Sequence, residues 1–245
     1  MSKKHHGGSK PDSSPQVVQR DKLKDGFSIK EFPWTEKQQK FIAAALDKNT
    51  KIIFCKSCPG TGKTLLSLFC CLQLLSKKSI SNVIYYRSPI ESASRSLGFL
   101  GGDYEEKISR YGGPLYDHLN ELLDKATTNR IMEEKRLSVE SIGFAKGLSH
   151  HVTGVILDES EDLSLQEIEL IMCRMGQFSK LFIIGDIRQA NIRNSGFETA
   201  FNLFNDEASK FLGIHTFEFD SNDCMRSPIL KFIVNKFEGA SLPLK

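Results

Sequence analysis

A short glycine-containing segment, residues 57–64, limits the folds open to this chain more than any other feature. Its sequence is Ser-Cys-Pro-Gly-Thr-Gly-Lys-Thr, and it joins an apolar run at 51–55 to an apolar, helix-like stretch at 63–76. Gly60 and Gly62 permit a tight turn whose backbone N–H groups point inward, and a helix that starts there adds partial positive charge. The segment therefore predicts a strand, an anion-binding loop and a helix in succession.

The segment also matches the phosphate-loop pattern G-x-x-x-x-G-K-[ST], with Ser57 at the position of the first glycine. In such a loop the lysine, here Lys63, reaches the β- and γ-phosphates of a nucleotide, and Thr64 places its hydroxyl on Mg²⁺. We expect Ser57 to temper the affinity rather than to change the kind of ligand. The predicted nucleotide-binding residues of the loop are Ser57, Cys58, Pro59, Gly60, Thr61, Gly62, Lys63 and Thr64.

The rest of the chain alternates apolar runs of strand length with longer helical stretches. The runs span 51–55, 82–86, 137–142, 152–157, 181–185 and 214–219, and the helical stretches span 37–46, 63–76, 115–125, 165–175, 196–204 and 228–237. Continuous apolar strands joined through helices indicate a mostly parallel sheet covered on both faces. With 245 residues, the chain is expected to form a single α/β domain with the P-loop NTPase fold. Glycines between residues 88 and 114 predict a long, functional loop.

Polar side chains follow two of the apolar runs. Asp158 and Glu159 come directly after the fourth run, and Asp186 and Gln189 follow the fifth. Carboxylates are costly inside a buried strand, whereas at its carboxyl end they face the ligand crevice of a parallel sheet. We therefore expect Asp158 to hold Mg²⁺, Glu159 to polarise the attacking water, and Gln189 to hydrogen-bond the γ-phosphate or the attacking water.

The positive charge of the chain is concentrated near its beginning. Residues 1–30 hold seven Lys or Arg and three Asp, which leaves 26 basic and 27 acidic residues in the remainder. The composition of residues 1–30 predicts a disordered basic arm, and residues 31–245 are expected to form the folded domain. The nearly neutral body is not a uniformly basic surface for nucleic acid, so a polyanion would contact local clusters or the arm.

The distribution of apolar residues predicts a cytoplasmic protein with no membrane partner. No run approaches the ~18 uninterrupted apolar residues of a membrane span, and residues 1–10 lack the apolar segment of a secretion signal. Six cysteines in such a chain are expected to be reduced thiols. Cys55 and Cys58 form a C-x-x-C pair, but without a second pair a phosphate loop explains them better than a metal site.

Further short motifs are spread over residues 35–239. They are Gly-Thr-Gly-Lys-Thr at 60–64, Arg-Ser-Pro at 87–89, Leu-Gly-Phe-Leu at 97–100, Glu-Lys-Ile at 106–108, Pro-Leu-Tyr-Asp at 114–117, Ile-Leu-Asp-Glu at 156–159, Arg-Met-Gly at 174–176, Gly-Asp-Ile-Arg-Gln at 185–189 and Arg-Ser-Pro at 226–228. Together they resemble the PhoH-like family, phosphate-starvation-type ATPases whose core is similar to the first motor domain of superfamily 1 helicases. The blocks at 97–100 and 114–117 are the most specific, since generic P-loop proteins lack them.

The resemblance implies an ATPase that uses ATP and Mg²⁺, forms homo-oligomers and acts with single-stranded RNA or DNA. Gln38 lies where the family and the helicases place a glutamine that reads the adenine edge. Arg226, with Arg174 as second choice, matches an arginine able to stabilise transition-state charge. The candidates for nucleic-acid contact are Arg87, Lys107 and Arg110, with Arg95 and Tyr111 beside them.

Two functions remain open at this stage. The first is ATP hydrolysis, coupled to single-stranded RNA or DNA. Its predicted catalytic residues are Lys63, Glu159, Gln189 and Arg226. The second is a regulatory module that binds a nucleotide and hardly turns it over. Two departures from the family's usual residues favour the second function: Ser57 replaces a glycine, and Glu161 replaces a neutral amide close to the phosphates.

Overall fold

The computed structural model of the chain describes residues 23–87, 113–145, 149–192 and 195–225, together with 229, 231–233 and 236. Its centre is a six-stranded sheet with the strand order β3-β2-β4-β5-β1-β6, in which every neighbouring pair is parallel. The strands are β1 (Ile52–Ser57), β2 (Asn82–Arg87), β3 (Leu137–Ser141), β4 (Thr153–Asp158), β5 (Lys180–Gly185) and β6 (Ile214–Phe219). The predicted α/β fold with a mostly parallel sheet is confirmed.

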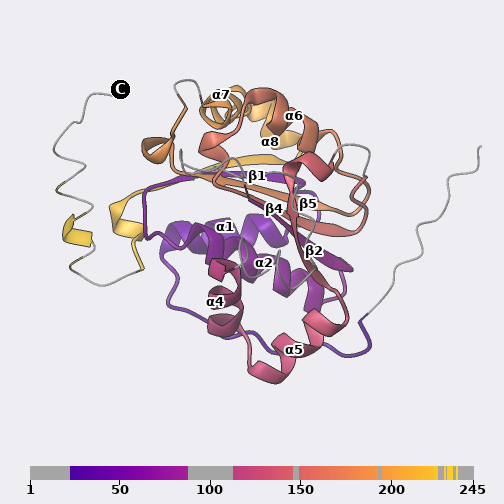
Figure 1. Cartoon of the computed structure of the whole chain (residues 1–245). Coiled ribbons are helices and arrows are strands. Elements are labelled where there is room, and N and C mark those ends of the chain that lie inside the picture. The colour runs from indigo at the N-terminus through magenta and orange to yellow at the C-terminus, as the bar shows by residue number, and fades with distance from the viewer. Residues whose placement is uncertain are drawn as a thin grey trace, which may run out of the picture.

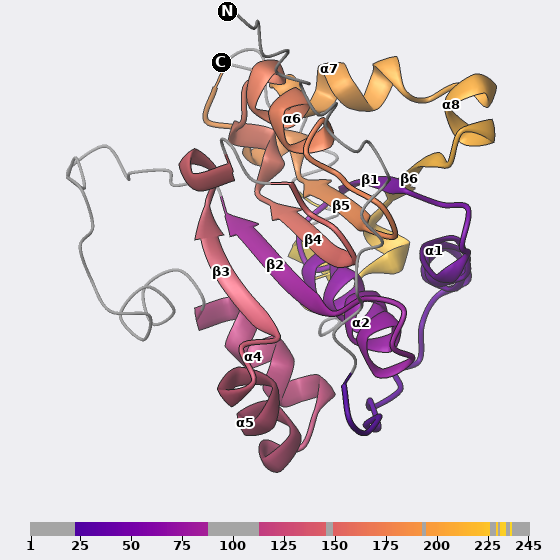
Figure 2. The same cartoon turned by 90° about the vertical axis from the view of Figure 1, so that its right-hand side faces the viewer.

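Helices cover both faces of this sheet, as Figure 1 and Figure 2 show from two sides. One layer consists of α1 (Glu36–Leu46), α2 (Lys63–Ser76), α4 (Gly113–Leu122) and α5 (Lys125–Glu133). The opposite layer consists of α6 (Leu165–Met172), α7 (Gly196–Leu203) and α8 (Glu207–Phe211). None of the described helices is long and apolar enough to span a membrane.

Successive side chains of the central strands point into the two different layers. On β5, Phe182 and Ile184 belong to the core beneath α2, whereas Leu181 and Ile183 belong to the core beneath α6 and α7. All four side chains are at most 1% exposed. A strand that is buried on both faces needs apolar side chains at successive positions, which explains why these runs show no polar alternation.

Two short helices of the structure lie outside the predicted helical stretches. The predicted helix at 115–125 is wrong at its end, because α4 stops at Leu122 and α5 begins anew behind Asp124. The Asp124 carboxylate accepts a hydrogen bond from the Thr127 N–H at 2.9 Å, a helix N-cap. Asp206 caps α8 in the same way. Most of the predicted long loop and of the predicted helix at 228–237 lies outside the described residues.

The packed part of the chain begins earlier than residue 31, which corrects the predicted boundary of the arm. Leu23 is only 4% exposed and belongs to the core beneath α2. The Phe27 N–H donates to Ser76 Oγ at 3.0 Å, and the Lys30 N–H donates to the Leu122 carbonyl at 2.9 Å. Residues 23–30 thus pack across α2 and α4, with apolar contacts from Leu23 and Phe27. The many charged residues of this segment led to the prediction of disorder. Residues 1–22 lie outside the described ranges.

Candidate nucleotide-binding site

The parallel sheet brings the predicted site residues to a single edge. Because all six strands run in the same direction, their carboxyl ends lie side by side, and this is where ligands bind to open α/β sheets. β1 ends at Ser57, β4 at Asp158, β5 at Gly185 and β2 at Arg87. The phosphate loop and the acids of the predicted metal site are therefore separated at this edge only by the end of β5.

The phosphate loop has the backbone shape that its sequence predicts. Gly60 and Gly62 have φ angles of 81° and 72°, in the left-handed region that residues with a side chain rarely adopt. Gly62 is the N-cap of α2 and has no side chain that caps the first N–H groups of this helix. Within the loop the Thr61 hydroxyl donates to the Cys58 carbonyl at 3.0 Å. Ser57 Oγ is buried and has no hydrogen-bond partner among the described residues.

The hydroxyl of Thr64 lies against the first acid of β4. Thr64 Oγ1 donates to Asp158 Oδ2 at 2.9 Å, and the buried Tyr85 hydroxyl of β2 donates to the same oxygen at 2.6 Å. Burial and the neighbouring Asp158 raise the pKa of the Tyr85 hydroxyl, so it remains a donor. Asp158 Oδ1 accepts from the Glu159 N–H at 2.9 Å. The sequence predicts Thr64 and Asp158, but Tyr85 looks like an ordinary residue of an apolar strand.

Glu159 is held by an arginine from the neighbouring strand. Arg87 Nε lies 3.0 Å from Glu159 Oε2, and Arg87 Nη2 lies 2.5 Å from Glu159 Oε1, so the pair is bidentate. The bonds to Glu159 raise the pKa of the Arg87 guanidinium. Glu159 has a φ of 53°, which is uncommon for a residue with a side chain and is often found at functional sites.

Two further acids, Glu161 and Asp186, lie at the end of β5. Glu161 is 4% exposed, and its Oε2 accepts the Asp186 N–H at 3.0 Å. Burial raises the pKa of the Glu161 carboxyl to about 7, and Asp158 acts in the same direction, whereas backbone N–H groups and Lys63 oppose the shift. Gln189 is exposed, and its amide nitrogen donates to Asp186 Oδ2 at 2.9 Å. The amide predicted to contact the γ-phosphate is therefore bonded to Asp186 in this structure.

Gln38 connects α1 to the phosphate loop. Its amide nitrogen donates to the Thr61 carbonyl at 3.0 Å and to the Asp223 carbonyl at 3.1 Å, and its amide oxygen accepts the Thr35 N–H at 2.9 Å. The side chain is 0% exposed. In this arrangement the amide satisfies the protein's own backbone, so the predicted contact with adenine requires these hydrogen bonds to open.

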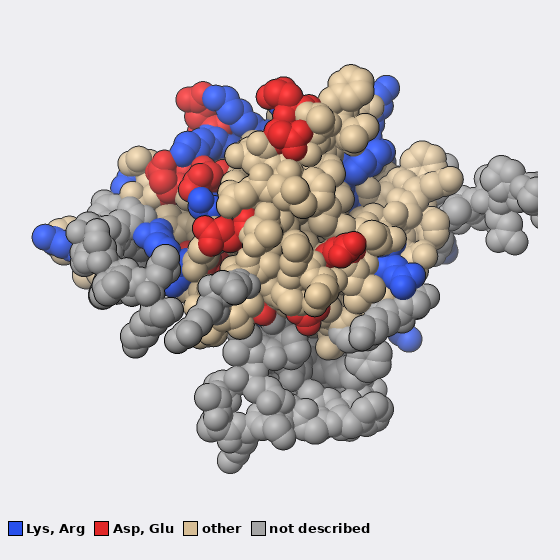
Figure 3. All heavy atoms as spheres, turned by 90° about the horizontal axis from the view of Figure 1, so that it is seen from above, with Lys and Arg blue, Asp and Glu red and all other residues tan. Residues whose placement is uncertain are grey.

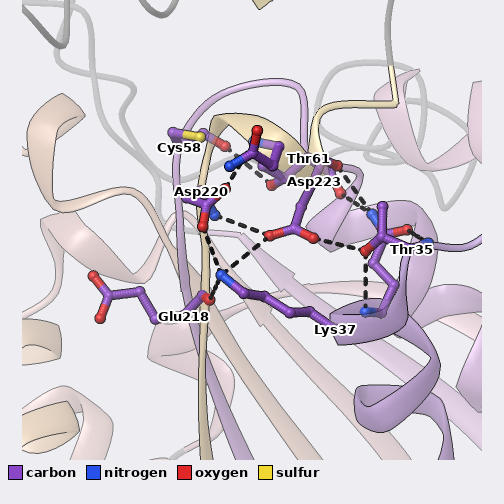
Figure 4. A network of polar contacts seen from close by, with 9 residues as sticks. Thr35, Lys37, Cys58, Thr61, Glu218, Asp220 and Asp223 are labelled. Atoms are coloured by element: carbon purple, nitrogen blue, oxygen red, sulfur yellow. Dashed lines mark hydrogen bonds and ion pairs between the residues drawn. The ribbon is translucent and has the colours of Figure 1, made fainter.

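The network around Gln38 includes an acid that sequence reasoning did not single out (Figure 4). Asp223, from the short turn after β6, is 3% exposed and accepts a hydrogen bond from the Thr35 hydroxyl at 2.7 Å. Lys37 pairs with Asp220 at 2.6 Å and approaches Asp223 to 3.6 Å. The Met225 N–H then donates to the Gly60 carbonyl at 3.1 Å. The turn after β6 is thereby fastened to the phosphate loop, although a Ser-Asn-Asp turn carries no distinctive sequence signal.

Met225 also covers the second glycine of the loop. Its sulfur would lie 3.0 Å from a Cβ at position 62, a contact that a small movement of the flexible Met225 side chain relieves. The φ angle of 72° is therefore the main reason for glycine at this position, because a side chain there would strain the backbone.

Several predicted residues are not brought to this edge. Arg174 lies at the opposite, amino end of the sheet, where its carbonyl accepts the His150 N–H at 2.8 Å just before β4 begins. The length of a six-residue strand, roughly 17–20 Å, therefore separates it from the phosphate loop of its own chain. The helix before β5 returns the chain to that end, as any parallel connection must. The other arginine candidate and the nucleic-acid candidates beyond β2 lie outside the described residues: Arg226, Arg95, Lys107, Arg110 and Tyr111.

The oxygen donors suit Mg²⁺ bound together with phosphate rather than a metal cage built from protein alone. Within the described ranges, no group of three or more His, Cys, Asp or Glu is arranged to hold a metal. Mg²⁺ usually takes one or two protein ligands and completes its shell with water and substrate phosphates. The adjacent oxygens of Thr64 and Asp158 meet this requirement. Cys55 and Cys58 are buried and form no disulfide, and burial raises the pKa of the Cys55 thiol.

The sequence has relatives that match most of its length. The chain is 30% identical over 201 residues to a PhoH-like protein of Bacillus subtilis, which covers 82% of this chain and 62% of that protein. It is 29% identical over 234 residues to a PhoH-like protein of Mycobacterium bovis, covering 94% and 64%, and 30% identical over 199 residues to Protein PhoH of Escherichia coli K12, covering 79% and 54%. The chain thus spans about 54–64% of the length of these relatives.

The fold is also found in a solved structure with a very different sequence. The large terminase from a thermophilic bacteriophage superposes with a TM-score of 0.50 at 11% identity, over 84% of this chain and 50% of that one. At this identity the similarity concerns the fold alone, which is that of the P-loop NTPases. The profile of the family described as PhoH-like protein matches residues 32–238. Because this match spans nearly the whole described domain, the chain belongs to the PhoH-like family.

Proposed function

We propose that this protein binds ATP with Mg²⁺ and hydrolyses it. The observation that carries this proposal is the 2.9 Å contact of Thr64 with Asp158, which joins the phosphate loop to the acidic end of β4. Glu159 follows Asp158 directly, so a metal-binding acid and a candidate base occupy adjacent positions. A loop without this partner strand would bind phosphate but would have no group to activate water.

Each residue of the edge has a separate task in this proposal. The uncapped N–H groups at the start of α2 and the ammonium of Lys63 bind the phosphates. Thr64 and Asp158 hold Mg²⁺, which, when bound, neutralises charge that develops on the phosphate oxygens. Glu159 accepts a proton from the attacking water, once its carboxylate is free to face that water. Gln189 hydrogen-bonds the γ-phosphate only after its hydrogen bond to Asp186 breaks.

A second candidate function is a regulatory module that binds a nucleotide and hardly turns it over. Two observations favour it over a fast enzyme. The Glu159 carboxylate is engaged by Arg87 through both oxygens, and Glu161 brings a further carboxyl close to Lys63 and Asp158. Ionised Glu161 adds negative charge where the transferred phosphoryl group gains it, which opposes hydrolysis.

Phosphate release by the purified protein separates the two functions. The measurement compares the wild type with Lys63→Ala, with and without Mg²⁺, and in the presence and absence of a single-stranded oligonucleotide. Multiple turnovers that need Lys63 and Mg²⁺ support the enzyme, whereas stoichiometric ATP binding without turnover supports the regulatory module. Lack of ATP binding would refute both.

We also propose a homo-oligomer with the nucleotide near the subunit boundary, in which Arg226 stabilises the transition state of a neighbour. The proposal rests on the resemblance to one helicase motor domain: the described residues form a single sheet, and a neighbouring copy would supply the surface that closes over the nucleotide. Mixing Arg226→Ala with Glu159→Gln would restore part of the activity, because some mixed interfaces pair an intact Glu159 with an intact Arg226. If sedimentation shows a monomer at a concentration at which the protein has full ATPase activity, this proposal is wrong.

For nucleic acid, the one face of the molecule seen in Figure 3 supports a local contact rather than a broad basic surface. On the face that carries α6, α7 and α8, basic and acidic side chains are interspersed among uncharged ones (Figure 3). The arginine at the end of β2, Arg87, lies at the ligand-binding edge of the sheet. We therefore propose that single-stranded RNA or DNA reaches the protein beside β2, with Lys107 and Arg110 as further candidates.

A further inference from the structure

The strand β2 supplies one partner for each of the two acids at the end of β4. β2 pairs with β4 in parallel register, with Arg87 opposite Asp158. Tyr85 and Arg87 are two residues apart and therefore lie on the same face of the strand. The Tyr85 hydroxyl holds Asp158, and the Arg87 guanidinium holds Glu159. The state of the candidate base thus depends on a side chain from another strand.

The Arg87–Glu159 pair leaves the carboxylate unready to accept a proton. The two guanidinium nitrogens contact both carboxylate oxygens, at 3.0 Å and 2.5 Å, so neither oxygen is free of the cation. A general base must present an oxygen within hydrogen-bond reach of the water that it activates. The side chains are 28% and 36% exposed, so a dissolved ligand can reach the pair.

We propose that Arg87 is a positioning residue that holds Glu159 in a resting orientation, and that a phosphodiester of single-stranded nucleic acid releases Glu159 by taking over the guanidinium. This inference rests on the proposed ATP hydrolysis. A phosphate offers paired oxygens to the arginine fork just as a carboxylate does, so one ligand replaces the other without loss of geometry. Binding of the strand and activation of water then become coupled through one ion pair.

The position of Arg87 in the sheet indicates that the phosphate that binds it comes from a second ligand rather than from the bound nucleotide. β4 and β5 lie between β2 and β1, so three strand spacings, about 14 Å, separate the end of β2 from the end of β1. The nucleotide phosphates belong to the loop after β1, whereas Arg87 lies on the far side of Asp158 and Glu159. A strand that runs along this edge reaches Arg87 without displacing the nucleotide.

The test measures kcat and KM for ATP with and without a 20-nucleotide oligouridylate. The wild type is compared with Arg87→Ala, with Arg87→Lys, and with Lys56→Ala as the matched control. Lys56 lies on β1, three strand positions away from β2, and pairs with Glu218 at 2.8 Å. Its side chain is 31% exposed, close to the 28% of Arg87. Thermal unfolding of each variant reports whether it is folded.

We expect the oligonucleotide to stimulate kcat of the wild type and of Lys56→Ala. Arg87→Ala should have an oligonucleotide-free kcat about two- to fivefold above that of the wild type, the factor that a half-exposed ion pair provides, with an unchanged KM for ATP. The oligonucleotide should not stimulate it further. Arg87→Lys keeps the charge without the fork and should fall between the two. A merely structural role would instead lower kcat or raise KM.

Three results overturn the inference, and they differ in what they leave standing. A lower kcat in both Arg87 variants, or stimulation that persists in Arg87→Ala, refutes the resting role while ATP hydrolysis stands. A higher kcat in Arg87→Ala, together with a wild type that the oligonucleotide never stimulates, assigns the competing phosphate to the nucleotide itself. It refutes the proposal that single-stranded nucleic acid releases Glu159. Absence of phosphate release from the wild type and every variant refutes the hydrolysis on which the inference rests.

Discussion

The phosphate loop and the acidic end of β4 lie at the same edge of the sheet, but they are held in place in different ways. The loop takes its shape from its own glycines and from an internal hydrogen bond between Thr61 and Cys58. The two acids after β4 take their positions from β2, through Tyr85 and Arg87. The binding half of the site thus takes its shape mainly from its own residues, with Gln38 and Met225 bonded to its carbonyls. The catalytic half depends on a strand about seventy residues earlier in the chain.

The two halves of the site therefore differ in whether a ligand can regulate them. The partners that hold the loop from elsewhere, Gln38 and Met225, bond to its carbonyls, and Gln38 is fully buried, so a dissolved ligand does not compete for these contacts. A carboxylate fixed by an exposed arginine changes its orientation when that arginine finds another partner. We therefore expect substitutions in the loop to affect binding, and substitutions at β2 and β4 to affect turnover while binding persists.

The largest effect should come from Glu159→Gln. The amide keeps the shape of the side chain but cannot accept a proton from water, and loss of a general base lowers a rate by about 10²–10⁴-fold. Mg-ATP should remain bound, because Thr64 and Asp158 are untouched. Single-turnover phosphate release measures the first effect, and equilibrium binding of a fluorescent ATP analogue measures the second.

The control for this variant is Glu169→Gln, a substitution on the exposed face of α6. It should leave both measurements unchanged. Turnover that survives in Glu159→Gln would show that another group activates the water.

Lys63→Ala should reverse this pattern by removing binding. The variant loses the cation that meets the β- and γ-phosphates, and we expect the affinity for ATP to fall by about 100-fold, the magnitude of one or two charge-assisted hydrogen bonds. Because Lys63 is partly exposed, the melting temperature should hardly change. Undiminished binding of the fluorescent analogue would show that residues 57–64 are not the phosphate-binding loop.

Gln38→Ala tests whether the amide supports the loop or reads the base. It would leave the buried carbonyls of Thr61 and Asp223 without their donor, at a cost of about 1–3 kcal/mol in the free energy of unfolding. We expect ATP and GTP to lose affinity equally, because the loop is distorted for both. Urea unfolding and parallel ATP and GTP titrations provide the two measurements. A loss confined to ATP would assign the amide to adenine instead.

Tyr85→Phe is a milder change on the side of β4. It removes one hydrogen bond to Asp158 and leaves those from Thr64 and from the Glu159 N–H. The expected cost is about 1 kcal/mol in the free energy of unfolding, with a several-fold rise in the Mg²⁺ concentration needed for half-maximal activity. A Mg²⁺ requirement equal to that of the wild type would show that Tyr85 does not position the metal-binding carboxylate.

The same contrast explains how far the sequence predicts this molecule. All six strands and the limits of α2 follow from apolar runs and loop signals, because these elements are determined by burial and by local turns. Lys63, Thr64, Asp158 and Glu159 follow from motif spacing and from the rule that carboxyl ends of parallel strands share an edge. These are properties of short segments.

What the sequence does not predict consists of contacts between distant segments. Nothing in an apolar strand marks Tyr85 as the partner of an acid, and nothing in a Ser-Asn-Asp turn marks Asp223 as a buried anchor for the phosphate loop. Arg174 looks like a plausible partner for phosphate until the return of the chain after α6 takes it to the opposite end of the sheet. Side-chain partners depend on register and strand order, which a single sequence does not reveal.

An effect on the pH dependence of stability alone is expected at Glu161, whose pKa is raised by burial from 4.5 to about 7. Between these two values the folded protein holds a proton that the unfolded chain has lost, so the free energy of unfolding falls as the pH rises from about 4.5 to 7. Glu161→Gln has no such proton to hold and should have a flatter profile, with a difference on the order of 1–3 kcal/mol across this window. Glu169→Gln, on the exposed face of α6, should keep the wild-type slope. Urea unfolding at pH 5 and pH 8 measures the slopes, and equal slopes in Glu161→Gln and the wild type would mean that Glu161 is ionised throughout. In that case its negative charge would stand beside Lys63 and Asp158 at neutral pH, which is the condition under which the site binds a nucleotide and turns it over slowly.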